Sequence, residues 1–217
     1  MFDTAVKLSD LMLMAKGAGM TLLVTAISVT CGTVLGIIFG VARYQLGPYW
    51  SAPLMFVLDI FRSIPLLIQL TLGYAFITIV LGIRMSGFPV ACLVLTLYTS
   101  AYCAEIVRGA IEAVPLTLRR ASRSLGMTWG QDMRQIVLPL ATRVALPSWI
   151  GLALGVMKDS ALVYVVQVHE LLKTTQSIIT RLQEPLFLLI LCGAFYFLIS
   201  FPVARFGGWL EKRWSND

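Results

Sequence analysis

Charged and polar side chains that interrupt long apolar stretches are the groups of this chain best placed to do chemistry. Arg62 and Glu105 flank apolar runs, and Lys158 and Asp159 break another one. A charge held away from water is costly, so such a residue is usually paired or used to bind or conduct a polar solute. Pro65 can bend a helix just after Arg62 and free backbone carbonyls toward a cavity. The residues expected to line a polar pathway are Arg62, Ser63, Pro65, Gln69, Glu105, Lys158, Asp159 and Ser160.

The same residues also have a structural interpretation. Asp59 and Arg62 are three residues apart, as are Glu105 and Arg108, so each pair shares a helix face and can neutralise itself while fixing helix packing. The segment 158–160 could instead lie at a helix end, with its long side chain reaching lipid headgroups. The sequence leaves both interpretations open.

The residue sets that enzymes and metal sites need are missing from the sequence. The single histidine, His169, has no second metal ligand at a suitable spacing, and the scattered carboxylates provide no nucleophile with a base. The four cysteines fall in apolar runs and form no C-x-x-C pair, which favours a packing role. There is no G-x-x-x-x-G-K-[ST] motif to cradle ATP phosphates. We therefore expect a chain that is not an enzyme and binds no metal or cofactor.

Composition points to a membrane protein. Hydrophobic residues make up 58% of the chain and charged residues only 13%, whereas about a quarter of a typical soluble domain is charged. At 217 residues there is room for one helix bundle and for no second large domain. The formal net charge of +6 comes without the interleaved aromatic residues of a nucleic-acid-binding surface. The expected fold is all-α, a single polytopic domain (1–217) that contacts membrane lipid and no nucleic acid.

The distances between charged residues predict about five membrane spans, because a helix needs about 20 apolar residues to cross the hydrocarbon core. The predicted spans lie near residues 17–42, 63–83, 85–104, 144–168 and 185–204. The fourth of these spans is interrupted by Lys158 and Asp159. The other four predicted spans contain no charged residue away from their ends.

Five spans place the termini on opposite sides, so the distribution of lysine and arginine predicts which side is cytoplasmic. One side carries ten of these residues, namely Arg43, Arg108, Arg119, Arg120, Arg123, Arg134, Arg143, Arg205, Lys212 and Arg213. The other side carries six, namely Lys7, Lys16, Arg84, Lys158, Lys173 and Arg181. We expect the N-terminus outside and the C-terminus in the cytoplasm.

A folded cytoplasmic elbow is predicted at 115–139, where hydropathy falls while helix-forming residues persist. Pro115 starts a short helix that Thr117 can cap, and Gly126 ends it. One face of this helix is expected to consist of Leu118, Ala121, Ser122 and Leu125. Such a helix can dock in a soluble partner or rest its arginines on anionic headgroups.

A second short helix is predicted after the turn. Thr128 followed by Gln131 has the spacing of a capping box, and Pro139 marks the return to the membrane. The expected elbow is therefore a helix–turn–helix on the cytoplasmic face.

The elbow resembles the EAA loop of binding-protein-dependent ABC importers, in the segment VPLTLRRASRSLGMTWGQDMRQIVLPLA. The matching residues are Ala121, Gly126, Ile136, Leu138 and Pro139. Arg120 stands where the family usually has glutamate, and Ser122 replaces the second alanine of the triplet. Three further segments, FRSIPLLIQL, AYCAEIVRGAI and KDSALVYVV, resemble the polar amino-acid uptake branch, of the histidine, glutamate or glutamine type. The resemblance runs from about residue 17 to the C-terminus.

The resemblance implies a permease of the type I ABC importer fold in the cell (inner) membrane. It also implies a second identical or homologous permease, two identical ATPase subunits that hold ATP and Mg, and an extracytoplasmic substrate-binding protein. The residues it implies for coupling to the ATPase are Arg119, Arg120, Ala121, Ser122, Ser124, Leu125, Gly126 and Met127.

The expected function is to form half of an alternating-access pathway for a polar amino acid. An acidic amino acid such as glutamate or aspartate is slightly favoured, because Arg62 and Lys158 are candidate cations at membrane depth. A basic or neutral polar amino acid is the alternative, since Asp59 and Asp159 can neutralise these cations. An ion-coupled carrier or a channel fits the hydropathy but leaves the elbow unexplained.

Overall fold

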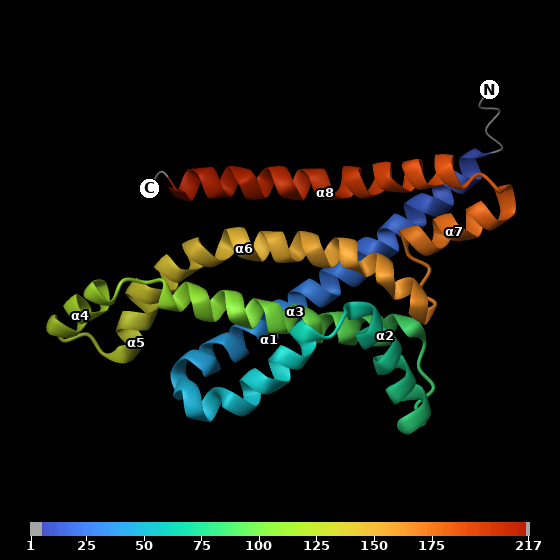
Figure 1. Cartoon of the computed structure of the whole chain (residues 1–217). Helices are drawn as coiled ribbons and strands as arrows, with labels where there is room; N and C mark the ends of the chain where they lie inside the picture. The colour runs from blue at the N-terminus through green and yellow to red at the C-terminus, as the bar shows by residue number, and fades with distance from the viewer. Residues whose placement is uncertain (1–5, 216–217) are drawn as a thin grey trace.

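In the computed structural model, which describes residues 6–215, the chain is built from helices joined by short turns (Figure 1). The helices are α1 (Leu8–Ser63), α2 (Leu66–Ala75), the π-helix η1 (Phe76–Val80), α3 (Gly87–Glu112), α4 (Leu116–Ser124), α5 (Trp129–Asp132), the π-helix η2 (Met133–Val137), α6 (Leu138–Asp159), the 3₁₀-helix η3 (Ser160–Val166), α7 (Leu171–Leu182) and α8 (Pro185–Ser215). No strand occurs within residues 6–215, which confirms the expected all-α class.

Helix α1 is interrupted by a tight turn at Gly47. This residue has φ 70° and ψ 174°, a conformation open in practice only to glycine, so the helix is broken there. The first arm, Leu8–Gly47, is 40 residues long and apolar enough to cross a membrane. The second arm, Tyr49–Ser63, carries both Asp59 and Arg62.

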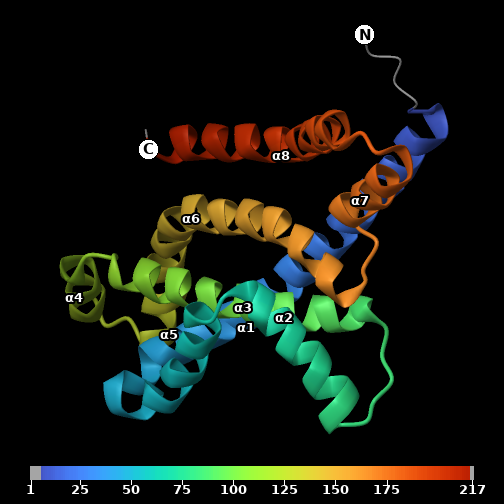
Figure 2. The same cartoon turned by 45° about the vertical axis from the view of Figure 1, so that its right-hand side comes forward.

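A second break separates α1 from α2. Ile64 adopts an extended conformation and Pro65 follows it, as expected because proline cannot continue a helix and disfavours helical geometry in the residue before it. The arm Tyr49–Ser63 and the segment Leu66–Val80 are bent against each other by 107°. Figure 2 shows α2 turning away from the bundle at this point.

Four helices within residues 6–215 are long and apolar enough to span a membrane, and the bent pair is a fifth if it forms one broken span. The four are Leu8–Gly47, Gly87–Glu112, Trp129–Val166 and Pro185–Arg213. They overlap the expected spans 17–42, 85–104, 144–168 and 185–204.

The expected span 63–83 does not coincide with one straight helix, because it begins at the Ser63–Pro65 break. The charge-free run after Arg62 suggested a span boundary at that residue. Helix α1 ends at Ser63, one residue after Arg62, and the helices inside the run are Leu66–Ala75 and Phe76–Val80. Arg62 therefore did mark a helix end, and its pairing with Asp59 allows both charges to lie in a bent span that includes Tyr49–Ser63.

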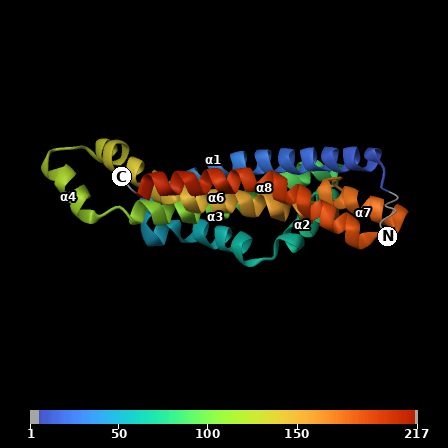
Figure 3. The same ribbon diagram turned by 90° about the horizontal axis from the view of Figure 1, so that it is seen from above.

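The long helices run side by side, and the chain ends lie at opposite ends of the molecule (Figures 1 and 3). Helices α1, α3 and α6 pack together, α8 lies along α6, and α7 lies against the N-terminal arm of α1 (Figure 1). Helices α4 and α5 project at the same end as the C-terminus, away from α7 (Figure 3).

Three glycines of α1 allow it to approach α3 closely. A Cβ atom at Gly32 would lie 2.6 Å from Thr99 Cβ, and one at Gly36 would lie 2.4 Å from Cys103 Cβ. At Gly40 the added atom would lie 2.7 Å from the carbonyl oxygen of Ala104. A glycine every fourth residue is typical of tightly packed membrane helices, and this contact fixes the register of α1 against α3.

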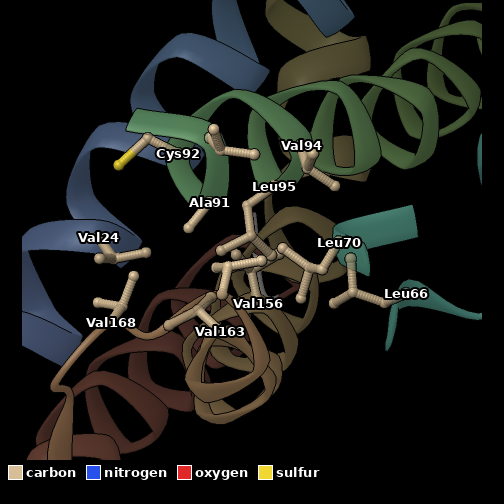
Figure 4. Packing of buried hydrophobic residues seen from close by; sticks show 12 residues of the cluster. Val24, Leu66, Leu70, Ala91, Cys92, Val94, Leu95, Val156, Val163 and Val168 are labelled. Atoms are coloured by element: carbon tan, nitrogen blue, oxygen red, sulfur yellow. The ribbon is translucent and has the colours of Figure 1, made fainter. Parts of the chain in front are cut away.

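The largest buried apolar cluster joins five elements (Figure 4). Val24 of α1, Leu70 of α2, Leu95 of α3, Val156 of α6 and Val163 of η3 all belong to it. Because Asp159 and Ser160 lie between Val156 and Val163, this packing holds the polar interruption of the fourth expected span in place.

The 115–139 elbow contains one free-standing helix, α4, and the start of a longer one. Pro115 precedes α4 without a side-chain cap, so the expected cap by Thr117 is wrong: Thr117 lies inside the helix. The capping box of Thr128 and Gln131 is confirmed at the start of α5. From Trp129 the helix continues through η2 into α6, so Pro139 lies in the first turn of α6 within one rod.

Candidate functional site

Helix α3 carries a row of polar side chains along one face. Tyr98, Tyr102 and Glu105 are spaced four and three residues apart, which places them above one another on a helix. The Tyr98 hydroxyl donates to Asp159 Oδ2 at 3.4 Å, and the Tyr102 hydroxyl donates to the Arg62 carbonyl oxygen at 3.3 Å. The ring centroids of the two tyrosines lie 4.8 Å apart. We call these three residues the α3 polar face. At one end Tyr98 contacts Asp159, and at the other end Tyr102 and Glu105 contact Arg62.

Glu105 is the centre of an ion-pair cluster. Its carboxylate lies 2.7 Å from Arg43 Nη1 and 3.3 Å from Arg62 Nη1, and it also accepts a hydrogen bond from Arg108 Nη2. Arg62 Nη1 also lies 3.3 Å from Asp59 Oδ1. The Glu105 cluster consists of Arg43, Asp59, Arg62, Glu105, Arg108 and Glu112.

The cluster balances its charges. It contains three arginines and three carboxylates, and Arg108 Nη1 pairs with Glu112 at 2.6 Å. The expected pairs Asp59–Arg62 and Glu105–Arg108 are both confirmed. Arg62 is therefore paired on two sides, and the structure does not present it as a free cation at membrane depth.

The helix break beside Arg62 is closed by a side chain. Gln69 Nε2 donates to the carbonyl oxygens of Phe61 at 2.8 Å and Ile64 at 2.6 Å, which the break at Pro65 leaves without helical partners. The expectation that these carbonyls face a cavity is wrong, because Gln69 bonds them within the protein. Ser63 and Pro65 themselves are exposed.

The polar segment Lys158–Asp159–Ser160 occurs where α6 changes to the 3₁₀-helix η3. Lys158 is exposed and Asp159 is half-buried beside Tyr98. Ser160 is buried and donates to the Met157 carbonyl oxygen at 2.7 Å. Of these three residues, Asp159 is the one in contact with the α3 polar face.

The residues expected to share one face of α4 differ in their exposure to solvent. Leu118, Ala121 and Leu125 are exposed, with Leu125 at 83%, whereas Arg119 and Ser122 are buried. Ser122 was expected on the same face as the leucines; its spacing fits that face, but it is buried against Asp132 while the leucines are exposed. Among the expected coupling residues, those exposed to a partner are Arg120, Ala121, Ser124, Leu125 and Gly126, and Met127 is half-buried.

The turn after α4 has the hydrogen bonds of a Schellman motif. Gly126 has φ 79°. Its N–H donates to the Arg123 carbonyl oxygen at 2.9 Å, and the Met127 N–H donates to the Ser122 carbonyl oxygen at 3.1 Å. A glycine with positive φ is the usual residue at this position, so the local structure accounts for Gly126 in the sequence.

A groove of about 310 Å³ lies between α1, α3 and α6, but its lining is apolar. Ile37, Val107 and Leu146 are among its residues, and Trp149 Nε1 donates to Thr33 Oγ1 at 2.8 Å within it. A zwitterionic solute would find no charged partner there, so the α3 polar face is the better candidate for a polar pathway.

The sequence interpretation missed several residues of these sites. Arg43 was counted only for topology, although it pairs with Glu105 from 62 residues away. Tyr102 was not considered, and its helical spacing from Tyr98 and Glu105 was the signal that could have found it.

Known proteins resemble this chain over almost its whole length. The family described as the binding-protein-dependent transport system inner membrane component matches residues 32–216. The probable amino-acid ABC transporter permease protein YckA of Bacillus subtilis (strain 168) is 32% identical, covering 99% of this chain and 95% of that protein. The histidine/lysine/arginine/ornithine transport system permease protein HisM of Escherichia coli (strain K12) is 31% identical, covering 91% of this chain and 87% of that protein.

Solved structures share the fold. A crystal structure of an amino acid ABC transporter with histidines has a TM-score of 0.87 at 27% identity, covering 97% of this chain and 100% of that one. The MetNI methionine ABC transporter in an inward-facing conformation has a TM-score of 0.72 at 23% identity, covering 94% of this chain and 99% of that one, and supports the fold alone. The chain belongs to the binding-protein-dependent transport system inner membrane components, as an amino-acid ABC transporter permease with the type I importer fold that relies on a separate ATPase.

Proposed function

We propose that this permease forms half of an alternating-access pathway for a polar amino acid and that the α3 polar face lines it. The observation that carries the proposal is the connection of Asp159, Tyr98, Tyr102 and Arg62 along one face of α3. A second permease, identical or homologous, supplies the other half. Two identical ATPase subunits bind ATP and Mg, and an extracytoplasmic binding protein delivers the solute.

The experiment that tests this function is uptake by the complete complex in proteoliposomes. Labelled amino acid should accumulate only with ATP and the binding protein present. Replacing the phosphate-binding lysine of the partner ATPase should abolish uptake. Uptake that persists with that variant would instead indicate a channel or an ion-coupled carrier.

The 115–139 loop is proposed as the docking surface for the ATPase. Leu116, Leu118 and Leu125 are exposed at the tip of the elbow, where a soluble partner would bury them. The family usually has glutamate at position 120, so Arg120 favours an acidic contact on the ATPase in this complex.

We propose an acidic amino acid as the substrate, and the charge of Lys158 is the only observation that supports this choice. Arg62 is paired with Asp59 and Glu105, so it contributes no free charge to recognition. Lys158 is exposed next to Asp159 and can pair with the carboxylate of a bound solute.

A basic amino acid is the second candidate. Asp159 lies at the end of the α3 polar face and can pair with a cationic side chain. HisM and the arginine transport system permease ArgU of Corynebacterium glutamicum, which is 31% identical over 100% of this chain and 70% of that protein, carry names that refer to basic amino acids.

Exchanging each charge separates the two substrates. Lys158→Met should lower glutamate uptake about tenfold and spare arginine, since one charge-assisted hydrogen bond contributes about 1.5–3 kcal/mol and 1.4 kcal/mol is about a factor of ten. Asp159→Asn should do the reverse if the substrate is basic. The control is Arg84→Met, which removes one positive charge from an exposed position. Saturable arginine uptake by the unmodified complex, with no glutamate uptake, would overturn the acidic assignment.

The proposed orientation has the N-terminus outside and the elbow and C-terminus in the cytoplasm. Ser177→Cys in α7 should then react with a membrane-impermeant maleimide in intact cells. Glu211→Cys near the end of α8 should react only after permeabilisation; both positions are exposed. The unmodified chain, with its native cysteines in the spans, measures the background. Labelling of Glu211→Cys in intact cells would reverse the orientation.

A further inference from the structure

We infer that Arg119 and Asp132 tie the elbow to the cytoplasmic end of the first arm of α1, Leu8–Gly47, so that Arg119 is a positioning residue for transport. The inference rests on the proposed function, in which the elbow receives movement from the ATPase. It adds a second route for that movement. Besides the continuous rod from α5 into α6, the elbow would act directly on α1 through buried side chains.

The tie consists of four residues from three elements. Arg119 of α4 lies with its Nε 3.3 Å from Asp132 Oδ2, and Ser122 Oγ donates to Asp132 Oδ1 at 2.6 Å. Arg119 Nη1 donates to the hydroxyl of Tyr44 in α1, and its guanidinium carbon lies 5.5 Å from the Tyr44 ring centroid. We call Tyr44, Arg119, Ser122 and Asp132 the elbow tie.

The two charged side chains of the elbow tie are buried. The side chain of Arg119 is 10% exposed and that of Asp132 only 1%. Removing either charge would leave the other one desolvated and unpaired, so the two residues hold α4 against α5. The other arginines of α4, Arg120 and Arg123, are exposed, and Arg123 adds only a favourable charge near Asp132.

The elbow tie contacts α1 next to a residue of the Glu105 cluster. Tyr44 lies three residues before the turn at Gly47, and its neighbour Arg43 pairs with Glu105 at 2.7 Å. Glu105 belongs to the α3 polar face and also pairs with Arg62. A displacement of Arg119 is therefore transmitted through consecutive residues of α1 to the Glu105 cluster, at the inner end of the proposed pathway.

The residues of the elbow tie are far apart in the sequence. Arg119 and Ser122 fall in the segment that resembles the EAA loop, where both were expected to meet the ATPase. Their actual partners are Asp132, which is 13 and 10 residues away from them, and Tyr44, which is 75 residues from Arg119. Only the folded elbow brings these four side chains together.

The test measures amino-acid uptake and ATP hydrolysis together, in the complete complex in proteoliposomes. Tyr44→Phe removes a single hydroxyl, Arg119→Met removes the charge, and the exchange Arg119→Asp with Asp132→Arg restores the ion pair in reverse. We expect uptake per ATP hydrolysed to fall at least about fivefold in Tyr44→Phe and Arg119→Met, the lower range of typical coupling between distant sites. The reversed pair should recover part of the loss in Arg119→Met.

The control is Arg143→Met, which removes an exposed arginine from α6 outside the elbow and should leave uptake per ATP unchanged. The amount of ATPase that copurifies with each permease variant reports assembly. If Tyr44→Phe keeps the unmodified ratio, or if uptake and hydrolysis fall only in proportion to assembly, the inference is wrong. Absence of ATP-driven uptake by the unmodified complex would instead overturn the proposed function.

Discussion

Replacing Gly126 by valine is expected to leave the permease in the membrane but to lower ATP-driven uptake about tenfold or more. Gly126 has φ 79°, and a left-handed conformation costs about 1–2 kcal/mol for a residue with a Cβ atom and more for a β-branched one. A cost of 1.4 kcal/mol corresponds to about a factor of ten. Within residues 6–215, no atom outside the turn lies within 4 Å of an added Cβ, so the effect arises from the backbone and not from a clash.

The turn at Gly126 fixes the orientation of α4, and through it the proposed docking surface. The Gly126 and Met127 N–H groups bond the last carbonyls of α4, so a distorted turn reorients α4 and the exposed Leu125. Docking of the ATPase should weaken while the spans remain intact. Membrane-inserted protein and substrate-stimulated ATP hydrolysis are the two measurements needed.

Gly130→Val is the matched control for this prediction. Gly130 lies in α5 with a negative φ, and a Cβ atom there would meet nothing within 4 Å. The same side chain four residues further along lies in the same docking loop but leaves the backbone unstrained, so it should lower uptake much less than Gly126→Val does. Equal uptake by Gly126→Val and Gly130→Val would show that the turn geometry does not matter for coupling.

The second large effect is expected from Glu105→Gln, which should reduce the amount of folded permease. Three arginines share the Glu105 carboxylate, and removing its charge leaves them with only Asp59 and Glu112. The side chain is 29% exposed, so we expect a loss near the lower end for charged hydrogen bonds, about 2 kcal/mol. The apparent melting temperature of the purified permease complex in detergent measures this loss.

Asp59→Asn provides the comparison. Asp59 also contacts Arg62, but it has this one ionic partner within the described residues and its side chain is 42% exposed. An exposed pair of this kind contributes about 0–1 kcal/mol, so the melting temperature should change little. If the two substitutions lower the melting temperature equally, Glu105 is not the centre of the cluster.

Much of the fold followed from local sequence signals. The charge-free runs 17–42, 85–104 and 185–204 lie in three of the long helices, because a membrane span needs its own continuous apolar surface, and the interrupted run 144–168 overlaps the fourth. Thr128 with Gln131, and Gly126 after α4, were predicted from residues at most three positions apart, and the structure contains both features. Caps and turns are formed by neighbouring residues, so their signal survives in the sequence alone.

Local signals failed where a contact with another helix changed the outcome. The run 63–83 was predicted as a span because it lacks charges, but the helical part of it, Leu66–Val80, is bent by 107° from Tyr49–Ser63 and crosses a membrane only if the two form one broken span. Ser122 was grouped with Leu118, Ala121 and Leu125 on one face of α4, but of these four it alone is buried, and it donates to Asp132. Asp132 lies on another helix, so the spacing of residues within α4 does not reveal this partner.

The sequence by itself determined that this chain is an all-α membrane protein with a folded elbow, since hydropathy and turn residues are properties of short segments, and its resemblance to the EAA loop indicated a permease. The tertiary structure alone decided which charges pair over long sequence separations. Arg43 and Arg62 reach Glu105 from 62 and 43 residues away. They do so because Gly32, Gly36 and Gly40 let α1 pack directly on α3 in one register, and because the turn at Gly47 brings the arm that carries Arg62 back beside α3. Packing distance and chain reversal set these partners, and neither is visible in the spacing of the residues themselves.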